Sequence, residues 1–260
     1  MGKDNLEGAQ MKIFAITNQK GGVGKSTTAH ALGVGLANQK RKVLLIDLDE
    51  QADLSFIVGA KPGPGSFEIL TGQAKLKDAA QETKTKGLYI VPGSINLANL
   101  DLILKGEGGS GLLLKEALKG AAYDYIIIDV PPGLGSQGAN ALNAANALII
   151  PTQANLLGLK NLNIFWEKTI KAIKRTNKNL RVAGVLFTNY KPNAVLSKAV
   201  EPAFNDLAKN MGSKVFKARI RNSALIEKAQ ASHQAIFEYS KKNAAGLDYL
   251  EFVEEIKKFK

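Results

Sequence analysis

The sequence predicts an α/β fold with a doubly wound, mostly parallel sheet that is flanked by helices. Short apolar runs alternate with helix-like segments along the chain, which is the signature of βαβ units. Several runs are apolar throughout, as strands are when helices cover both faces of a sheet. The chain has 260 residues, 45% of them hydrophobic, and is long enough for one large domain with a sizeable core.

Each expected element follows from the apolar pattern and its flanking residues. The runs expected to form strands are, in order, Lys12–Asn18, Lys42–Asp47, Leu88–Pro92, Tyr125–Asp129, Ala147–Pro151 and Val182–Thr188, with Val215–Ala218 as an edge strand. The segments expected to form helices are Ser26–Gln39, Gly111–Leu118, Gly138–Ala144, Leu159–Thr176, Lys198–Lys209, Ala224–Ala231 and Gly246–Lys257. The glycine-rich stretches Lys61–Ser66 and Gly106–Gly111 are expected to be loops. Nothing marks a second domain, so residues 11–260 are expected to form one.

A glycine-rich stretch follows the first expected strand and opens the first expected helix. It reads Lys20-Gly21-Gly22-Val23-Gly24-Lys25-Ser26-Thr27. Glycines in this context let successive backbone N–H groups turn around an anion, and the helix N-terminus adds its positive dipole end. Lys25 is expected to reach the phosphates of a nucleotide and Ser26 to bind Mg²⁺. The Walker A pattern G-x-x-x-x-G-K-[ST] fails at Gln19, and an additional lysine, Lys20, precedes the glycine pair.

Two further strands end in acidic residues, and parallel strands bring their carboxyl ends to the same edge of a sheet. The second strand leads into Asp47-Leu48-Asp49-Glu50-Gln51-Ala52, and a later one into Asp129-Val130-Pro131-Pro132-Gly133. A carboxylate that ends a buried strand beside a phosphate loop can hold a water of Mg²⁺. Asp124, before the later strand, is expected to be a turn or capping residue.

Together these motifs resemble the deviant Walker A ATPases of the ParA/MinD superfamily, most closely the short ParA and Soj-type partitioning ATPases. The loop resembles K-G-G-x-G-K-[ST], and the two acidic segments resemble D-x-D-P-Q-[GA] and D-[TA]-P-P-[SA]. The resemblance extends from about Met11 to the C-terminus. It implies a P-loop fold, ATP and Mg²⁺ as cofactors, and ATP hydrolysis that is slow and stimulated by a partner.

The resemblance also implies roles for single residues. The phosphates are held by Gly21, Gly22, Val23, Gly24, Lys25, Ser26 and Thr27. Ser26 binds Mg²⁺, and Asp47 and Asp129 contact the metal ion through water. Asp49 positions the attacking water, and Lys20 reaches across a dimer to the nucleotide of the partner subunit.

The base side of the nucleotide site matches the family less well. The segment Ala218–Asn222 resembles I-P-R-N and the segment Leu186–Lys191 occupies the T-M-x-D position, which implies that Asn189 and Arg221 lie at the nucleotide. Asn189 and Lys191 replace the usual Met and Asp, so GTP is not excluded. Glu50 stands where the family has Pro and adds negative charge near the γ-phosphate. The hydrolysis rate therefore stays open.

Positive charge is concentrated in one segment. The chain has a net charge of +12, and the segment Lys160–Arg221 holds 14 Lys and Arg residues against three acids. Such a segment favours a polyanion partner, and the alternative is a solvated lysine-rich face with no partner. The resemblance implies non-specific duplex DNA, bound by a homodimer that forms on ATP binding and is released by a ParB-like or other adaptor. The residues expected to contact DNA are Arg221, by the family match, and Arg219, Lys191, Lys214 and Lys217, from charge alone.

Composition excludes several classes of protein. The chain has no cysteine, which rules out a disulfide framework, a thiolate zinc site and an iron–sulfur cluster. No apolar stretch reaches the ~18 residues of a membrane span. Residues 1–10 are polar, lack the apolar core of a signal peptide, and are expected to be a disordered leader or a cloning remnant. A cytoplasmic, nucleoid-associated protein is expected.

Two other functions stay open. A MinD-like positioning ATPase acts on a membrane surface through a basic amphipathic tail. The last expected helix here carries Asp248, Glu251, Glu254 and Glu255, which would repel anionic lipid, so a packed helix and no membrane partner are expected. A metabolic P-loop synthetase is the other alternative, and it needs a substrate pocket that the sequence does not locate.

Overall fold

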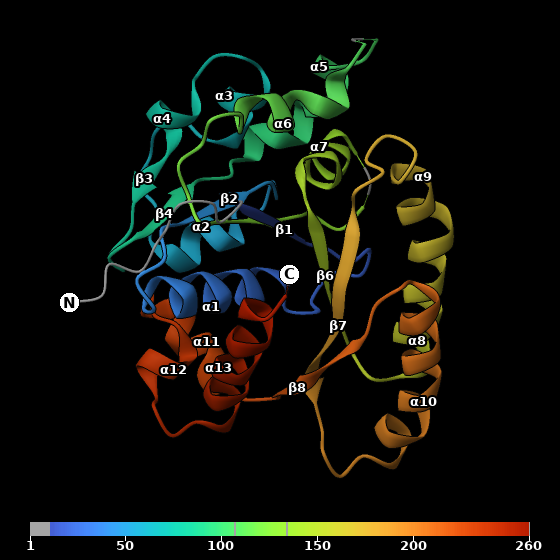
Figure 1. The fold of residues 1–260 in the computed structure, drawn as a ribbon. Helices are drawn as coiled ribbons and strands as arrows, with labels where there is room; N and C mark the ends of the chain where they lie inside the picture. The colour runs from blue at the N-terminus through green and yellow to red at the C-terminus, as the bar shows by residue number, and fades with distance from the viewer. Residues whose placement is uncertain (1–10, 107, 134, 260) are drawn as a thin grey trace, which may run out of the picture.

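The computed structural model describes residues 11–106, 108–133 and 135–259. The leader expected at residues 1–10 lies outside this range. A single sheet with the order β3-β4-β2-β5-β1-β6-β7-β8 runs through the molecule (Figure 1). Its strands are β1 Lys12–Ile16, β2 Val43–Asp47, β3 Gln81–Glu82, β4 Leu88–Val91, β5 Tyr125–Asp129, β6 Ala147–Thr152, β7 Arg181–Tyr190 and β8 Val215–Arg221. All neighbouring strands are parallel except β3 and β4, which confirms the predicted fold class.

Helices cover both faces of the sheet because its central strands are apolar on both sides. In β1, Ile13 and Ala15 belong to one hydrophobic core, and Phe14 and Ile16 to the other. The first core is covered by α3 Ser66–Leu70, α4 Leu76–Ala79, α5 Leu100–Ile103, α6 Leu113–Ala117, α7 Ser136–Ala144, α8 Leu156–Phe165, α9 Lys171–Ile173 and α10 Val195–Asn210. The second is covered by α1 Lys25–Ala37, α2 Asp53–Val58, α11 Leu225–Ala231, α12 Ile236–Tyr239 and α13 Ala244–Lys257.

The predicted strands and the long helices are confirmed, and their ends are the main difference. The helix expected over Leu159–Thr176 begins earlier, at Leu156, and changes to a π-helix at Trp166–Ile170 before α9. The helix expected from Lys198 begins at Val195, and β7 and β8 both run further than expected. The glycine-rich stretches are loops only in part: α3 begins at Ser66, and a short 3₁₀ helix covers Ser110–Leu112.

The last helix packs against the body of the molecule, as expected. Tyr249, Phe252, Val253 and Ile256 of α13 are buried in the second core, against α1 and β8. Within the described ranges, no helix combines the length and apolar character that crossing a membrane requires.

The contact between β7 and β8 leaves no room for a side chain at Gly184. A Cβ there would lie 2.5 Å from Cε2 of Phe216, whose ring is buried and packs edge-on against Phe252 with 5.0 Å between centroids. We expect Gly184→Ala to lower the free energy of unfolding by ~1–3 kcal/mol, measured by urea denaturation, because the ring must move.

Two further variants separate this overlap from a general effect of replacing glycine. Phe216→Leu in the Gly184→Ala background should recover part of the lost stability, since the smaller side chain makes space. Gly108→Ala is the control, because a Cβ at Gly108 meets no atom within 4 Å. If Gly184→Ala has the same free energy of unfolding as wild type, β7 and β8 are not packed this closely.

Candidate functional site

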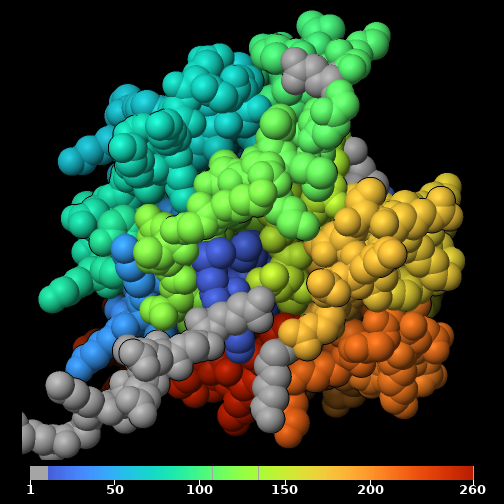
Figure 2. Space-filling view, turned by 45° about the horizontal axis from the view of Figure 1, so that its top comes forward, coloured from blue at the N-terminus to red at the C-terminus, as the bar shows by residue number. Residues whose placement is uncertain are grey.

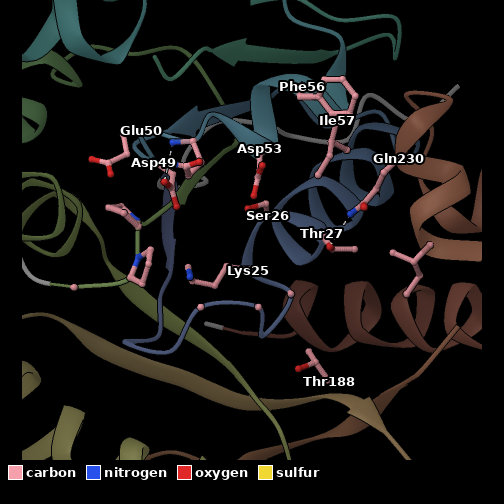
Figure 3. Close-up of a pocket in the computed structure, with 18 of the residues that line it drawn as sticks. Lys25, Ser26, Thr27, Asp49, Glu50, Asp53, Phe56, Ile57, Thr188 and Gln230 are labelled. Carbon is pink, nitrogen blue, oxygen red and sulfur yellow. Dashed lines mark hydrogen bonds between the residues drawn. The ribbon is translucent and has the colours of Figure 1, made fainter. Parts of the chain in front are cut away.

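A cavity of about 920 Å³ lies at the carboxyl ends of the central strands, where the sequence predicts the phosphate site. Figure 3 shows its lining. Lys25 and Ser26 come from the glycine-rich loop and the start of α1, and Asp49, Glu50 and Asp53 come from the segment that follows β2. Thr188 lies at the far end of β7, and Gln230 comes from α11. The structure therefore brings residues from distant parts of the chain around one space.

The glycine-rich loop needs glycine for its backbone conformation. Gly22 and Gly24 have φ angles of +68° and +78°, which non-glycine residues rarely adopt. The loop is held from below by Thr188, whose hydroxyl donates a hydrogen bond of 2.9 Å to the carbonyl oxygen of Val23. Gly24 precedes the first residue of α1, so the loop leads straight into the helix N-terminus, where free N–H groups can bind an anion.

Lys25 is the cation at the centre of the site. Its side chain is largely buried, and burial lowers the pKa of its ammonium group. The charges of Asp129, Asp49 and Asp53 act in the opposite direction and favour the protonated form. The Lys25 ammonium group attracts an anionic ligand, whereas the three carboxylates around it repel one. The site therefore suits an anion that binds together with a metal cation.

Asp47 and Asp129 are buried directly beside each other. They end the neighbouring parallel strands β2 and β5, and the strand register pairs one with the other. Asp47 accepts hydrogen bonds from the backbone N–H of Ser55 (2.9 Å), from the Ser55 hydroxyl (2.7 Å) and from the N–H of Asp49 (3.1 Å). Burial nevertheless raises the pKa of Asp47 to about 6, and the charge of Asp49 adds to this.

Asp129 has no such support. Its side chain is 1% exposed, and neither carboxylate oxygen accepts a hydrogen bond. Burial raises its pKa well above the usual value, the charge of Asp47 raises it further, and Ser26 and Lys25 only partly oppose this. A buried carboxylate without a partner beside the Ser26 hydroxyl fits a hydrated Mg²⁺ ion, which keeps several waters and takes few protein ligands.

The acid that ends β2 and the acid just after it have different surroundings. Asp47 faces α2, whereas Asp49 lines the cavity. The Asp49 carboxylate accepts a hydrogen bond of 3.0 Å from the N–H of Gln51, and Ala52 then has a φ of +54°, a strained conformation for a residue with a Cβ. Glu50, which replaces the proline of the family motif, also lines the cavity.

Lys20 does not line its own cavity. Its ammonium group donates a hydrogen bond of 3.0 Å to the side-chain oxygen of Gln153, which follows β6. The Lys20 ammonium group is therefore held at Gln153, and neither residue is among those that line the cavity. Gln19 donates a hydrogen bond of 3.3 Å to the Thr169 hydroxyl, in the π-helical turn.

Of the two residues predicted at the nucleotide base, the structure brings only Asn189 to the cavity. Arg221 does not line it, because its guanidinium group binds Asp248 of α13 through two nitrogens, at 2.6 and 2.9 Å. Sequence reasoning missed the side chains from short helices. They are Asp53, Phe56, Ile57, Asp101, Glu227 and Gln230.

Gln230 illustrates why these residues were missed. It donates a hydrogen bond of 2.8 Å to the Thr27 hydroxyl across 203 positions of sequence (Figure 3). No local motif marks such a residue, because only the packing of α11 brings it to the phosphate loop.

The residues expected to contact DNA divide into two groups. Arg221, Arg219 and Lys214 each lie beside a carboxylate, at 2.6, 3.2 and 3.6 Å from Asp248, Glu201 and Glu255 respectively. Arg219 also lies over the Phe187 ring. Lys191 and Lys217 are exposed and make no ion pair with any described residue.

Asp129→Asn should stabilise the protein without nucleotide. The pKa of Asp129 is higher in the folded state than the unfolded value of 3.8, so the folded protein holds the carboxyl proton more tightly than the unfolded chain does. The stability of the wild type therefore falls as the pH rises from 3.8 to the folded-state pKa. Asparagine is uncharged, so urea denaturation at pH 8 should show a gain of ~1–3 kcal/mol that fades toward pH 4.

The control for this prediction is Asp206→Asn, which removes an exposed carboxylate and should change stability little at any pH. A loss of stability for Asp129→Asn at pH 8, with the wild-type pH dependence retained, would contradict the interpretation of Asp129 as an unbalanced buried charge.

Comparison with known proteins identifies the family. A family profile described as an AAA domain matches residues 11–182. The chain is 32% identical to the chromosome partitioning protein ParA of Caulobacter vibrioides, with 95% of this chain and 94% of the relative covered. It is 32% identical to the chromosome-partitioning ATPase Soj of Treponema pallidum, with 94% and 96% covered.

A similar solved structure agrees with the predicted cofactors. It is cobyrinic acid a,c-diamide synthase from Mycobacterium smegmatis with bound ADP and magnesium, which is 31% identical, has a TM-score of 0.80, and is matched over 94% of this chain and 93% of that one. The family predicted from the phosphate loop and the two acidic strand ends is confirmed. The chain belongs to the AAA-domain family of P-loop ATPases that includes ParA and Soj.

Proposed function

We propose that this chain is a partitioning or positioning ATPase, folded as one domain over residues 11–260. It forms a homodimer on binding ATP, binds duplex DNA without sequence preference in the cytoplasm, at the nucleoid, and is released when an adaptor protein stimulates hydrolysis. The observation that carries the proposal is the position of the Lys20 ammonium group. This lysine belongs to the phosphate loop, yet its ammonium group lies on Gln153, outside the cavity that the loop lines.

The proposed roles in ATP binding follow from the chemistry of the loop. Backbone N–H groups from Gly21 to Thr27 and the Lys25 ammonium group hold the phosphates. The Ser26 hydroxyl holds Mg²⁺, with Asp47 and Asp129 reached through water. When bound, Mg²⁺ neutralises phosphate charge and shields it from the carboxylates around Lys25.

The proposed role in hydrolysis falls to Asp49. Its carboxylate lines the cavity and is fixed on one side by the N–H of Gln51, so the second oxygen is available to orient a water molecule. Asn189 lines the same cavity, which supports its proposed contact with the nucleotide. Glu50 adds a further negative charge to the same wall, which fits slow hydrolysis in the absence of an adaptor.

A dimer gives Lys20 its function. In a face-to-face arrangement of two cavities, the lysine of each subunit is free to leave Gln153 and reach the phosphates held by the other. Loss of the γ-phosphate removes that contact, and DNA affinity falls because two positively charged subunits no longer act together. ATP hydrolysis thereby times the release of DNA.

A second candidate is a metabolic synthetase. The observation that favours it is the 31% identity to a solved cobyrinic acid a,c-diamide synthase. The two functions differ in what stimulates ATP turnover, which is an adaptor together with DNA in one case and a small acceptor molecule in the other.

Lys20→Ala tests the dimer directly. We expect the variant to bind ATP but to lose ATP-dependent dimerisation and ATP-dependent binding to random-sequence duplex DNA. The reason is that the Lys20 side chain contacts the phosphates held by the partner subunit and not those held by its own. Analytical ultracentrifugation and fluorescence anisotropy, each with ATP, ADP and no nucleotide, measure the two effects. Lys119→Ala removes a lysine that only forms a surface ion pair and is the control. Full ATP-dependent DNA binding by Lys20→Ala would rule out the trans role.

Asp49→Ala separates binding from hydrolysis. We expect ATP hydrolysis to fall by roughly 10²–10⁴-fold, the usual contribution of a positioned acid or base, while nucleotide affinity stays within a few-fold of wild type. The variant should therefore remain on DNA in the presence of ATP. Phosphate release and DNA retention are the measurements, with exposed Asp78→Ala as the control. Hydrolysis at the wild-type rate would exclude Asp49 from the reaction.

A further inference from the structure

We infer that DNA is bound by the outer face of the helix that runs from α8 through the π-helical turn to α9, and not by the cations of β8. The inference rests on the proposed function and adds the surface that carries it. In Figure 1 this helix lies along one side of the molecule, and β3 and α4 lie on the opposite side. Figure 2 shows that the yellow segment, which contains it, forms an exposed border of the molecule.

The cations of β8 are largely committed to other contacts. Arg221 is bound by both oxygens of Asp248 and by the carbonyl oxygen of Ala244. Arg219 bonds to Glu201 and to the carbonyl oxygen of Phe216. A DNA phosphate would have to displace these partners and leave their carboxylates unpaired, which opposes the gain from the new contact.

The outer face of the α8–α9 helix carries a different charge pattern. Exposed cations recur along it, and Glu167 is its one acid in the described part of the chain. The cations are Lys160, Lys168, Lys171 and Arg175, and the partly exposed Lys174 lies beside them. Lys171 bonds to Glu167 at 2.7 Å, and Lys174 lies 5.3 Å from the centre of the Trp166 ring. Lys160, Lys168 and Arg175 have no carboxylate partner among the described residues.

The dimensions suit a DNA backbone. At ~1.5 Å per residue, the interval from Lys160 to Arg175 covers roughly 20 Å, and duplex DNA presents one phosphate charge per ~1.7 Å of its axis. Lys178 is exposed just beyond α9 and continues the charge toward the end of the helix. Trp166 is buried, so the face offers no aromatic ring for stacking and suits phosphates better than bases.

The same helix is attached to the phosphate loop at two points. The Thr169 hydroxyl, in the π-helical turn, accepts a hydrogen bond from Gln19, the residue before Lys20. At the other point, Asn155 caps the start of α8 and also contacts Gln153, the residue that holds Lys20. The DNA surface and the lysine that reaches the partner subunit therefore share their supports, which links the surface to the nucleotide state.

The test is the triple variant Lys160→Gln, Lys168→Gln, Arg175→Gln, studied as the full chain with ATP and random-sequence duplex DNA. We expect the triple variant to bind DNA at least roughly tenfold more weakly than wild type. A plot of the logarithm of the binding constant against the logarithm of the salt concentration should also be less steep, by ~0.9 for each DNA phosphate that the variant no longer neutralises. ATP-dependent dimerisation should be unchanged, because none of the three residues lines the nucleotide cavity.

Two control variants locate the effect. Lys75→Gln, Lys77→Gln, Lys84→Gln removes the same charge from exposed lysines near α4 and β3, at the opposite edge of the sheet, and should bind DNA within twofold of wild type. Lys191→Gln, Lys217→Gln removes the exposed cations near β8 and should bind like wild type. A loss of binding confined to this double variant would overturn the assignment in favour of β8.

The remaining outcomes are distinguishable. If wild type binds DNA and the triple variant binds equally, the surface is wrong and the proposed function stands. If wild type binds DNA in no nucleotide state, the proposed function fails and takes the surface with it. Binding of wild type to vesicles that contain phosphatidylglycerol but not to DNA, with that binding lost in the triple variant, would make the face a membrane surface.

Discussion

Two buried carboxylates placed side by side are the constraint on which the candidate site depends. The register of β2 and β5 pairs Asp47 with Asp129, and both side chains are almost completely excluded from solvent. The protein stabilises Asp47 with two hydrogen bonds from Ser55 and one from the N–H of Asp49, and it leaves Asp129 with none. Like charges in this position repel and oppose folding, so the arrangement makes physical sense as a site that a cation completes.

That constraint connects the nucleotide to the rest of the molecule. Lys25 is buried among carboxylates, and the segment after β2 that carries Asp49 is anchored by the same Asp47 that opposes Asp129. On the other side, Lys20 and Gln19 fix the phosphate loop to Gln153 and to the helix with the exposed cations. A bound nucleotide with its metal ion would neutralise the charge of the buried acids. It would also draw Lys20 away from Gln153 toward a partner subunit, and so change the contacts between the phosphate loop and the helix with the exposed cations. Charge balance thereby links nucleotide state to the outer surface.

Local pattern was sufficient for the central strands, the phosphate loop and the acids that end β2 and β5, because each combines an apolar run with a distinctive neighbour. It was insufficient for α2, which is short and too irregular to show a period, although it carries Phe56 into the cavity. The helix α11 was predicted at Ala224–Ala231, but nothing in the local pattern indicated that its Gln230 lines the cavity. The local pattern also gave no sign that Arg221 forms an ion pair with Asp248. Its partner Asp248 is 27 positions away, and tertiary packing alone brings the two together.

The most direct test of this account is whether proton release accompanies nucleotide binding. Calorimetric titration of a non-hydrolysable ATP analogue, with magnesium in excess and at pH 6, is carried out in two buffers with different ionisation enthalpies. Because the pKa of Asp47 is raised to about 6 and that of Asp129 is also raised, binding should release protons, and the measured enthalpy should differ between buffers. Equal enthalpies in the two buffers would contradict the claim that the acid pair is completed by the metal and its nucleotide.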